Sequence, residues 1–189
     1  MDRCAIFIDG AYVSKLFSVH LGGIRPDYGK IAALLSDGCD LLRTYYYDCR
    51  PYQSSPPTTE EKQRFSQKDK FMTALSKLPR FQVRLGKLEY RGKNQDGSPV
   101  FAQKRVDILL GVDMVELAAT KQISRAILVA GDSDFLPAIE AVKRQGVMTV
   151  LWHGTRGGKG KPSTCHNDLW DMCDERFEID ATVAKKVKR

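Results

Sequence analysis

The sequence has few of the residues that hold a protein together through covalent or metal cross-links. It contains five cysteines in 189 residues, an odd number without the paired spacings of a disulfide framework. Reduced thiols are typical of a reducing compartment, so we expect a cytoplasmic protein. Cys165, His166 and Cys173 also lack the ligand-pair spacing of a structural zinc site, which argues against zinc.

Long apolar runs are missing as well. No stretch of eighteen apolar residues is present, and the chain opens on strand-forming residues instead of a basic leader, so we expect neither a membrane span nor a secretion signal. With 42% hydrophobic residues and no visible linker or repeat, the chain is long enough to bury one core. We therefore predict one domain over residues 1–180, followed by a basic tail over residues 181–189.

Positive charge is in excess. The net charge is +7, which favours a polyanionic partner such as a nucleic acid, although charge concerns association and not fold. Part of the excess lies in the predicted tail, AKKVKR, which suits a solvated end as well as a nucleic-acid arm.

Short apolar runs alternate with segments of helical character. Residues 126–130 (AILVA) have the continuous apolar character of a strand buried on both faces, and a helix over 135–145 and a strand over 147–152 follow, as in a βαβ unit. We therefore predict an α/β fold with helices on both faces of a mostly parallel sheet. Further strands are expected at 4–8, 41–47, 81–90, 100–102 and 177–179, and further helices at 11–17, 28–35, 59–78, 104–120 and 163–173.

Acidic residues follow the ends of three predicted strands. They are Asp9 after residues 4–8, Asp48 after residues 41–47, and Asp132 and Asp134 after residues 126–130. Because parallel strands bring their carboxyl ends to the edge of the sheet where ligands bind, we expect these carboxylates to converge. Capping of the next helix by Asp134 or Ser133 explains one carboxylate of the last pair but not both.

The predicted helix over residues 104–120 carries two more carboxylates. Asp113 lies near the middle of its apolar stripe, where a carboxylate must be paired, hydrogen-bonded or metal-bound. A buried ion pair with a partner that the sequence does not name is the alternative for Asp113. Asp107 lies in the first turn, where the helix dipole favours a negative charge in any case.

A glycine-rich stretch at residues 154–161 (GTRGGKGK) combines three basic residues with four glycines. It does not have the spacing of a P-loop, and it follows the last long strand instead of the first. We therefore expect a mobile basic loop.

Three short motifs together resemble those of NYN domains of the LabA-like branch, which have the PIN-like nuclease fold. They are FIDGA at residues 7–11, KRVD at residues 104–107 with Asp113 six residues on, and GDSDF at residues 131–135. They recur in this order over most of the chain, and the combination is specific where each motif alone is weak. At Tyr12, Arg105 and Ala130 the family more often has Asn, Gly and Ser.

The resemblance implies a Rossmann-like three-layer α/β/α domain with an acidic cluster that binds Mg²⁺ or Mn²⁺ and cleaves RNA. Hard divalent cations prefer oxygen ligands, and in such sites they activate water and stabilise charge on phosphate. The expected primary ligands are Asp9, Asp107 and Asp132, with Asp134 as a ligand or water-positioning group, Asp113 and Ser133 in support, and Asp48 ranked below these.

On this hypothesis the substrate is RNA, with single strands preferred because aromatic rings such as Tyr12 can stack on unpaired bases. Trp152 is a second aromatic candidate that suits the core better. The predicted substrate-binding residues are Tyr12, Lys104, Arg105, Arg156, Lys159 and Lys161, with Lys143 and Arg144 expected on the same basic rim.

Two other functions are alternatives to the nuclease. A phosphatase with an aspartyl nucleophile needs a second Asp two residues after Asp9, where Ala11 stands. A non-catalytic RNA-binding or scaffold protein on the same fold is the alternative that stays open. The sequence also leaves the oligomeric state open, a homodimer included.

Overall fold

The computed structural model describes residues 2–97, 99–157 and 162–189, and in these residues the strands form one seven-stranded sheet in the order β4-β3-β2-β1-β5-β6-β7. The strands are β1 (Arg3–Asp9), β2 (Asp40–Cys49), β3 (Phe81–Lys93), β4 (Pro99–Lys104), β5 (Arg125–Val129), β6 (Met148–His153) and β7 (Glu175–Glu178). The helices are α1 (Gly10–Lys15) with a π-helical turn η1 (Leu16–His20), α2 (Tyr28–Leu35), α3 (Thr59–Ser76), α4 (Val106–Ala119), the 3₁₀ turn η2 (Ser133–Phe135), α5 (Leu136–Arg144), α6 (Asn167–Met172) and α7 (Ala181–Lys186).

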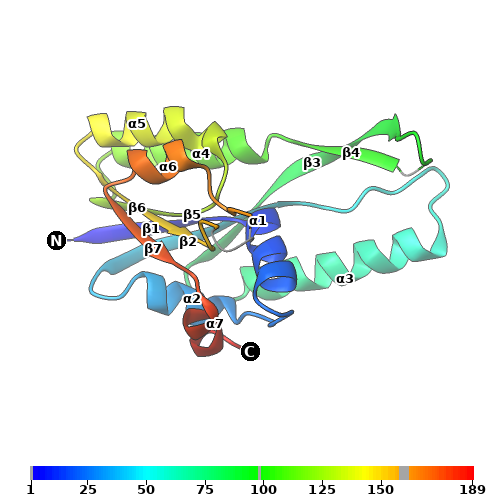
Figure 1. Cartoon of the computed structure of the whole chain (residues 1–189), viewed down its shortest axis with the longest axis horizontal. Helices are drawn as coiled ribbons and strands as arrows, with labels where there is room; N and C mark the ends of the chain where they lie inside the picture. Colours follow the sequence, from blue (N-terminus) through cyan, green and yellow to red (C-terminus); the bar gives the residue numbers. More distant parts are fainter. Residues whose placement is uncertain (1, 98, 158–161) are drawn as a thin grey trace.

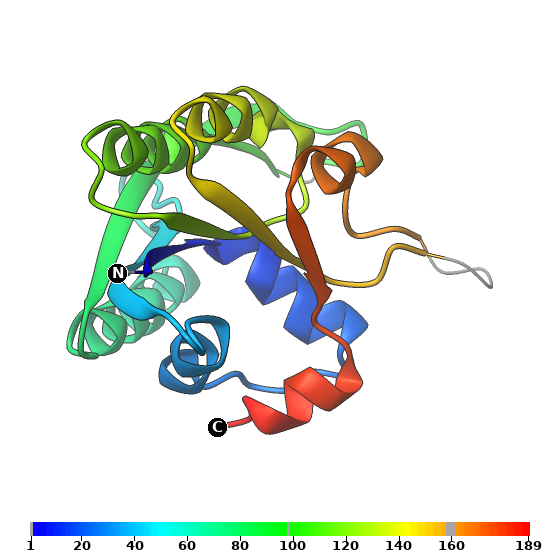
Figure 2. The ribbon, with the colours of Figure 1, turned by 90° about the vertical axis from the view of Figure 1, so that its left-hand side faces the viewer.

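Helices cover both faces of this sheet, which gives three layers (Figures 1 and 2). The helices α4, α5 and α6 lie on one face, and α1, α2, α3 and α7 lie on the other. Side chains of each inner strand alternate between the two cores: Tyr45 and Tyr47 of β2 pack under α4, whereas Tyr46 packs on the opposite side with Tyr28 of α2. The predicted α/β/α architecture is confirmed.

The inner strands all run the same way. β1 pairs in parallel with both β2 and β5, and β5 pairs in parallel with β6. In this register Ile8 of β1 lies beside Val129 of β5, so the chain leaves both strands at the same edge of the sheet. Asp9 and Asp132 therefore follow neighbouring strand ends, as predicted.

The hairpin β3–β4 extends beyond the body of the sheet (Figure 1). Only residues 81–86 of β3 pair with β2, and the remainder pairs with the antiparallel strand β4. The predicted hairpin return is thus confirmed. This end of the molecule is a two-stranded ribbon that lies beside α3 and the loop preceding it.

Two predicted segments are corrected. The closing helix is limited to Asn167–Met172, because the His166 side chain caps it by accepting the Asp168 N–H, and residues 163–165 precede the helix. The basic tail is not a solvated arm: α7 lies within it, and Ala184 and Val187 are buried against the α2 side of the sheet because they supply apolar surface at helical spacing.

Candidate active site

Asp9 ends β1 and begins α1. Its Oδ1 accepts hydrogen bonds from the backbone N–H groups of Ala11 (3.0 Å) and Tyr12 (3.1 Å), so the carboxylate is the N-cap of that helix. Gly10 permits this tight exit, because a Cβ there would lie 2.5 Å from the Tyr46 ring. The DG pair of the first motif thus fixes the direction of the Asp9 carboxylate.

Asp132 is placed by the same device after β5. Its Oδ1 accepts the Asp134 N–H at 3.1 Å and caps the 3₁₀ turn η2. The capping residue is therefore Asp132, whereas the sequence indicated Asp134 or Ser133 as the alternative. Gly131 has no room for a side chain, because a Cβ there would lie 2.1 Å from the backbone oxygen of Thr164.

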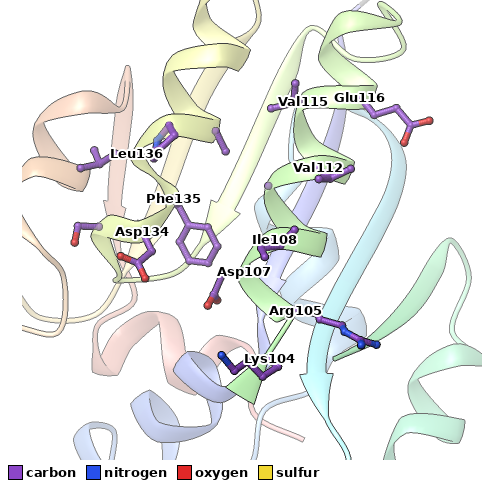
Figure 3. Close-up of a pocket in the computed structure, with 14 residues that line it drawn as sticks. Lys104, Arg105, Asp107, Ile108, Val112, Val115, Glu116, Asp134, Phe135 and Leu136 are labelled. Atoms are coloured by element: carbon purple, nitrogen blue, oxygen red, sulfur yellow. The ribbon is translucent and has the colours of Figure 1, made fainter. Parts of the chain in front are cut away.

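Asp107 and Asp134 come from two other elements and face one another across a groove (Figure 3). Asp107 lies in the first turn of α4, and Asp134 lies in η2. The groove has a volume of about 1080 Å³ and runs between α4 and the start of α5. Lys104 and Arg105 line the same groove at its β4 end. In Figure 3 the Lys104 amine lies on the side of the two carboxylates, whereas the Arg105 side chain points away from them.

Burial and neighbouring carboxylates raise the pKa of two acidic residues, Asp9 and Asp107. Burial, with the charges of Asp107 and Asp48 adding to it, raises the pKa of Asp9 to about 6, against the hydrogen bonds from the α1 backbone that lower it. Burial and the charges of Asp132 and Asp134 also raise the pKa of Asp107. These couplings join the carboxylates of all three motifs into one acidic cluster at the carboxyl edge of the sheet.

The carboxylate oxygens of this cluster are the type of ligand that hard divalent cations prefer. Asp9 and Asp132 each use one oxygen in capping, and their second oxygens accept no hydrogen bond from the described residues. However, no group of three or more His, Cys, Asp or Glu side chains within the described ranges is already arranged to hold an ion. The residues therefore fit Mg²⁺ or Mn²⁺ by ligand type, because such ions take one or two protein carboxylates together with water and phosphate oxygens.

Asp113 is neutralised by protein partners. The Tyr47 hydroxyl donates to its Oδ2 at 2.9 Å, and Arg84 Nε lies 3.1 Å from the same oxygen. This is the ion pair that the sequence left open, with the carboxylate buried and the Arg84 side chain partly exposed. Its partner Arg84 could not be named from the sequence, because it lies 29 residues earlier on β3.

Asp48 is buried and paired in a similar way. It forms an ion pair with Lys68 of α3, and its carboxylate accepts hydrogen bonds from the Tyr46 hydroxyl and from the backbone N–H of Cys49. These partners leave Asp48 a structural role beneath Asp9, in keeping with its lower rank.

The predicted substrate-binding residues lie in different surroundings. The Tyr12 hydroxyl accepts the Gly154 N–H at 2.8 Å and lies 3.3 Å from Thr164 Oγ1, so it ties the end of β6 to the first motif. Arg156 stacks 3.9 Å over the Trp170 ring and donates to Asn167 Oδ1 at 3.0 Å. Lys159 and Lys161, which belong to the second half of the glycine-rich stretch (residues 158–161), lie outside the described residues.

Arg105 has a left-handed backbone, with φ of 75° at the N-cap of α4. A glycine adopts this conformation without strain, which gives a physical reason for the glycine that the resembled family more often has at this position.

Two predicted rim residues lie elsewhere. Lys143 and Arg144 occupy the last turn of α5, about 12 Å of helix away from η2, since each residue advances a helix by 1.5 Å. Their charges are matched by Asp174 (2.8 Å) and Glu140 (2.8 Å). The prediction that they flank the acidic cluster is wrong, because helix α5 starts at the cluster and carries its C-terminus away from it.

Residues that no motif predicted also lie beside the cluster. A second depression of about 730 Å³ is lined by Asp9 and Asp132 together with Lys15 of α1 and the residues His166, Asn167 and Asp168 at the start of α6. Lys15 ends helix α1, and the other three residues lie at the start of helix α6, so no motif of the sequence indicated them. Lys15 and His166 add two more polar groups within reach of an anionic ligand in this depression.

Comparisons with known proteins agree with the motifs. The NYN domain family matches residues 3–177, so the chain belongs to that family. The family is part of a nuclease-like superfamily whose members generally use divalent metals.

One sequence relative and one solved structure are also similar to this chain. An uncharacterized protein, y4oD, from Sinorhizobium fredii is 30% identical over 89 residues, which is 46% of this chain and 37% of that protein, so the match spans well under half of the relative. A crystal structure of a protein of unknown function, VPA0982, from Vibrio parahaemolyticus superposes with a TM-score of 0.61 at 21% identity, covering 95% of this chain and 93% of that one. No helix among the described residues has the length and apolarity needed to cross a bilayer.

Proposed function

We propose that this NYN domain belongs to the LabA-like branch and is a Mg²⁺- or Mn²⁺-dependent endoribonuclease that hydrolyses phosphodiester bonds of single-stranded RNA. The observation that carries the proposal is geometric: Asp9 and Asp132 follow neighbouring strand ends, and Asp107 and Asp134 line one groove beside them. Uncompensated carboxylates repel one another and a polyanionic substrate, so the cluster calls for a cation.

In the proposed site Asp9, Asp107 and Asp132 hold the metal, which when bound activates water and stabilises charge on the scissile phosphate. Asp134, exposed at the mouth of the groove, orients the attacking water or adds a ligand. Lys104 and Arg105 bind phosphates that flank the scissile bond, because they line the groove with Asp107 and Asp134.

The neighbouring depression supplies further phosphate contacts. Arg156 is held in place by the Trp170 ring and by Asn167, one of the residues lining the depression of Asp9 and Asp132. A side chain held in this way loses little rotamer freedom when it binds an anion. Arg156 therefore serves as a preformed phosphate contact next to Asn167, which lines this depression.

The test is a cleavage assay on a circular single-stranded RNA, which only an endonuclease can open. Wild-type protein is incubated with Mn²⁺, Mg²⁺ or a chelator, beside Asp132→Asn and the matched control Asp37→Asn, whose aspartate is exposed before β2 at the opposite edge of the sheet. Cleavage that requires metal, persists in Asp37→Asn and is lost in Asp132→Asn supports the proposal. Salt-sensitive binding with intact RNA under every metal would instead support the non-catalytic RNA-binding function.

A further inference from the structure

The positive charge of the chain is concentrated in one contiguous stretch. Residues 50–105 contain thirteen Lys and Arg against five Asp and Glu, whereas the rest of the chain contains seventeen against eighteen. This stretch, which we call the basic arm, comprises the loop after β2, helix α3 and the hairpin β3–β4. In Figure 1 these elements form the end of the molecule that extends past the sheet. A net charge of +8 there accounts for the basic character of the whole chain.

The basic arm also carries an exposed aromatic cluster. Tyr90 of β3 and Phe101 of β4 are cross-strand partners, with ring centroids 5.9 Å apart and exposed fractions of 42% and 38%. The Tyr52 ring of the preceding loop lies 5.8 Å from Tyr90 and 5.3 Å from Phe101. The three rings are tilted against one another, and Tyr90 and Phe101 are the exposed members while Tyr52 is half-buried.

The chain leads directly from this cluster to the acidic cluster. Phe101 is followed along β4 by Lys104, which already lines the groove of Asp107. Three residues of strand span about 10 Å, since each advances by about 3.3 Å. A polymer held on the aromatic cluster therefore has only this length of strand to pass before it reaches the groove that Lys104 and Arg105 line.

We infer that the basic arm is a docking surface for unpaired nucleic-acid strands, on which Tyr90, Phe101 and Tyr52 stack successive bases and the surrounding lysines and arginines track the phosphates. This inference rests on the proposed function, because it names the path of the RNA toward the same site. Aromatic stacking combined with a basic track is how single strands are bound without sequence preference. Duplex RNA keeps its bases stacked inside, so these rings discriminate against it.

Charge complementarity selects this occupant over a second copy of the chain. Two arms of net charge +8 repel one another, and the exposed edge of β4 carries Lys104 beside Lys87, its partner across the ribbon. A polyanion instead releases counterions on binding such a surface. The exposed aromatic rings are then contact points for bases, and not the apolar centre of a protein interface.

The first experiment measures the affinity of the full chain for fluorescent single-stranded oligouridine in chelator, where no cleavage occurs. Tyr90→Leu and Phe101→Leu should each weaken binding by about 5- to 150-fold, the range for loss of one base–aromatic stack. Phe101→Tyr should keep most of the affinity. The matched control is Phe177→Leu, which removes an equally exposed ring (44%) from the opposite edge strand β7 and should change nothing. Unchanged affinity in both arm variants overturns the inference.

The second experiment tests the charge component without altering the rings. Arg91→Gln with Lys93→Gln removes two exposed charges next to Tyr90 and should reduce the salt dependence of binding by about 1.4 in log–log slope. Lys185→Gln with Lys186→Gln removes two charges from α7 and should leave the slope unchanged. An equal reduction by the α7 pair overturns the inference and returns the RNA contact to the C-terminal segment.

These outcomes separate the inference from the proposed function. Binding that depends on the arm, without cleavage under any metal, keeps the docking surface and removes the nuclease. Metal-dependent cleavage together with an affinity that the arm variants do not change keeps the nuclease and removes the docking surface. Light scattering of each variant identifies the rival occupant: a wild-type dimer that Phe101→Leu converts to a monomer shows that the rings contact protein, which contradicts the inference.

Discussion

Replacing Asp9 by Asn should make the metal-free protein more stable at neutral pH. Asp9 is charged in a half-buried position beside Asp107 and Asp48, and this environment raises its pKa to about 6. A pKa about two units above the ordinary value means that the ionised carboxylate lowers the free energy of unfolding by roughly 3 kcal/mol. Because the carboxylate keeps some contact with solvent, we expect about 1–2 kcal/mol. Asn retains the N-cap of α1, so the helix start is not lost.

The raised pKa of Asp9 also determines how the stability of the wild-type protein changes with pH. The folded state holds the Asp9 proton more tightly than the unfolded state, so wild-type stability falls as pH rises from about 4 through about 6. Below pH 4 Asp9 is protonated in both states, and the advantage of Asp9→Asn should vanish. The advantage should be complete above pH 7.

The assay is urea unfolding in chelator at pH 4, 5.5 and 7.5, with Asp37→Asn as the control for loss of one exposed charge. The predicted result is a stability difference that grows with pH for Asp9→Asn and stays near zero for Asp37→Asn. A variant no more stable than wild type at pH 7.5, or equally stabilised at pH 4, would refute the electrostatic reasoning about the cluster.

Three further predictions concern positions around the cluster. Arg105→Gly should stabilise the protein by up to about 1 kcal/mol in thermal unfolding, because it relieves a left-handed backbone; a lower melting temperature would contradict this. Asp113→Ala should destabilise by about 2–4 kcal/mol in urea unfolding, since Tyr47 and Arg84 lose their partner, whereas an unchanged midpoint would show that the ion pair is idle. Gly131→Ala should cost about 2 kcal/mol or more, because its Cβ meets the backbone of Thr164, and wild-type stability in this variant would mean that the loop yields freely.

Much of the fold followed from local pattern. The strand over residues 126–130 and the βαβ unit after it were predictable because a strand buried on both faces has an uninterrupted apolar run. The edge strand β7 was found only approximately, at Glu175–Glu178 instead of residues 177–179, because an edge strand is partly exposed and lacks that run.

The pattern of strands predicted the candidate site only where a residue follows a strand end, whereas Asp107 of α4 was identified through the resemblance of its motif. Asp9 and Asp132 could be placed on one edge from sequence, because parallel pairing fixes the direction of both strands. Lys143 was wrongly predicted beside the cluster. It is close to Asp132 in sequence, but the length of helix α5 separates the two residues in space. His166 and Arg84 were missed, since contacts across the fold between a loop or strand and a distant segment have no periodic signal.

The proposed metal site is tested most directly by locating a bound metal in the crystal. Crystals of the wild-type protein are soaked in Mn²⁺, and anomalous scattering data are collected above the manganese absorption edge, with Asp9→Asn crystals treated in the same way. We expect an anomalous peak bounded by the carboxylates of Asp9, Asp107 and Asp132 in the wild type, and its loss in the variant. A wild-type map with no peak at these carboxylates, or a peak that persists undiminished in Asp9→Asn, would contradict the proposal that this cluster is a metal-dependent active site.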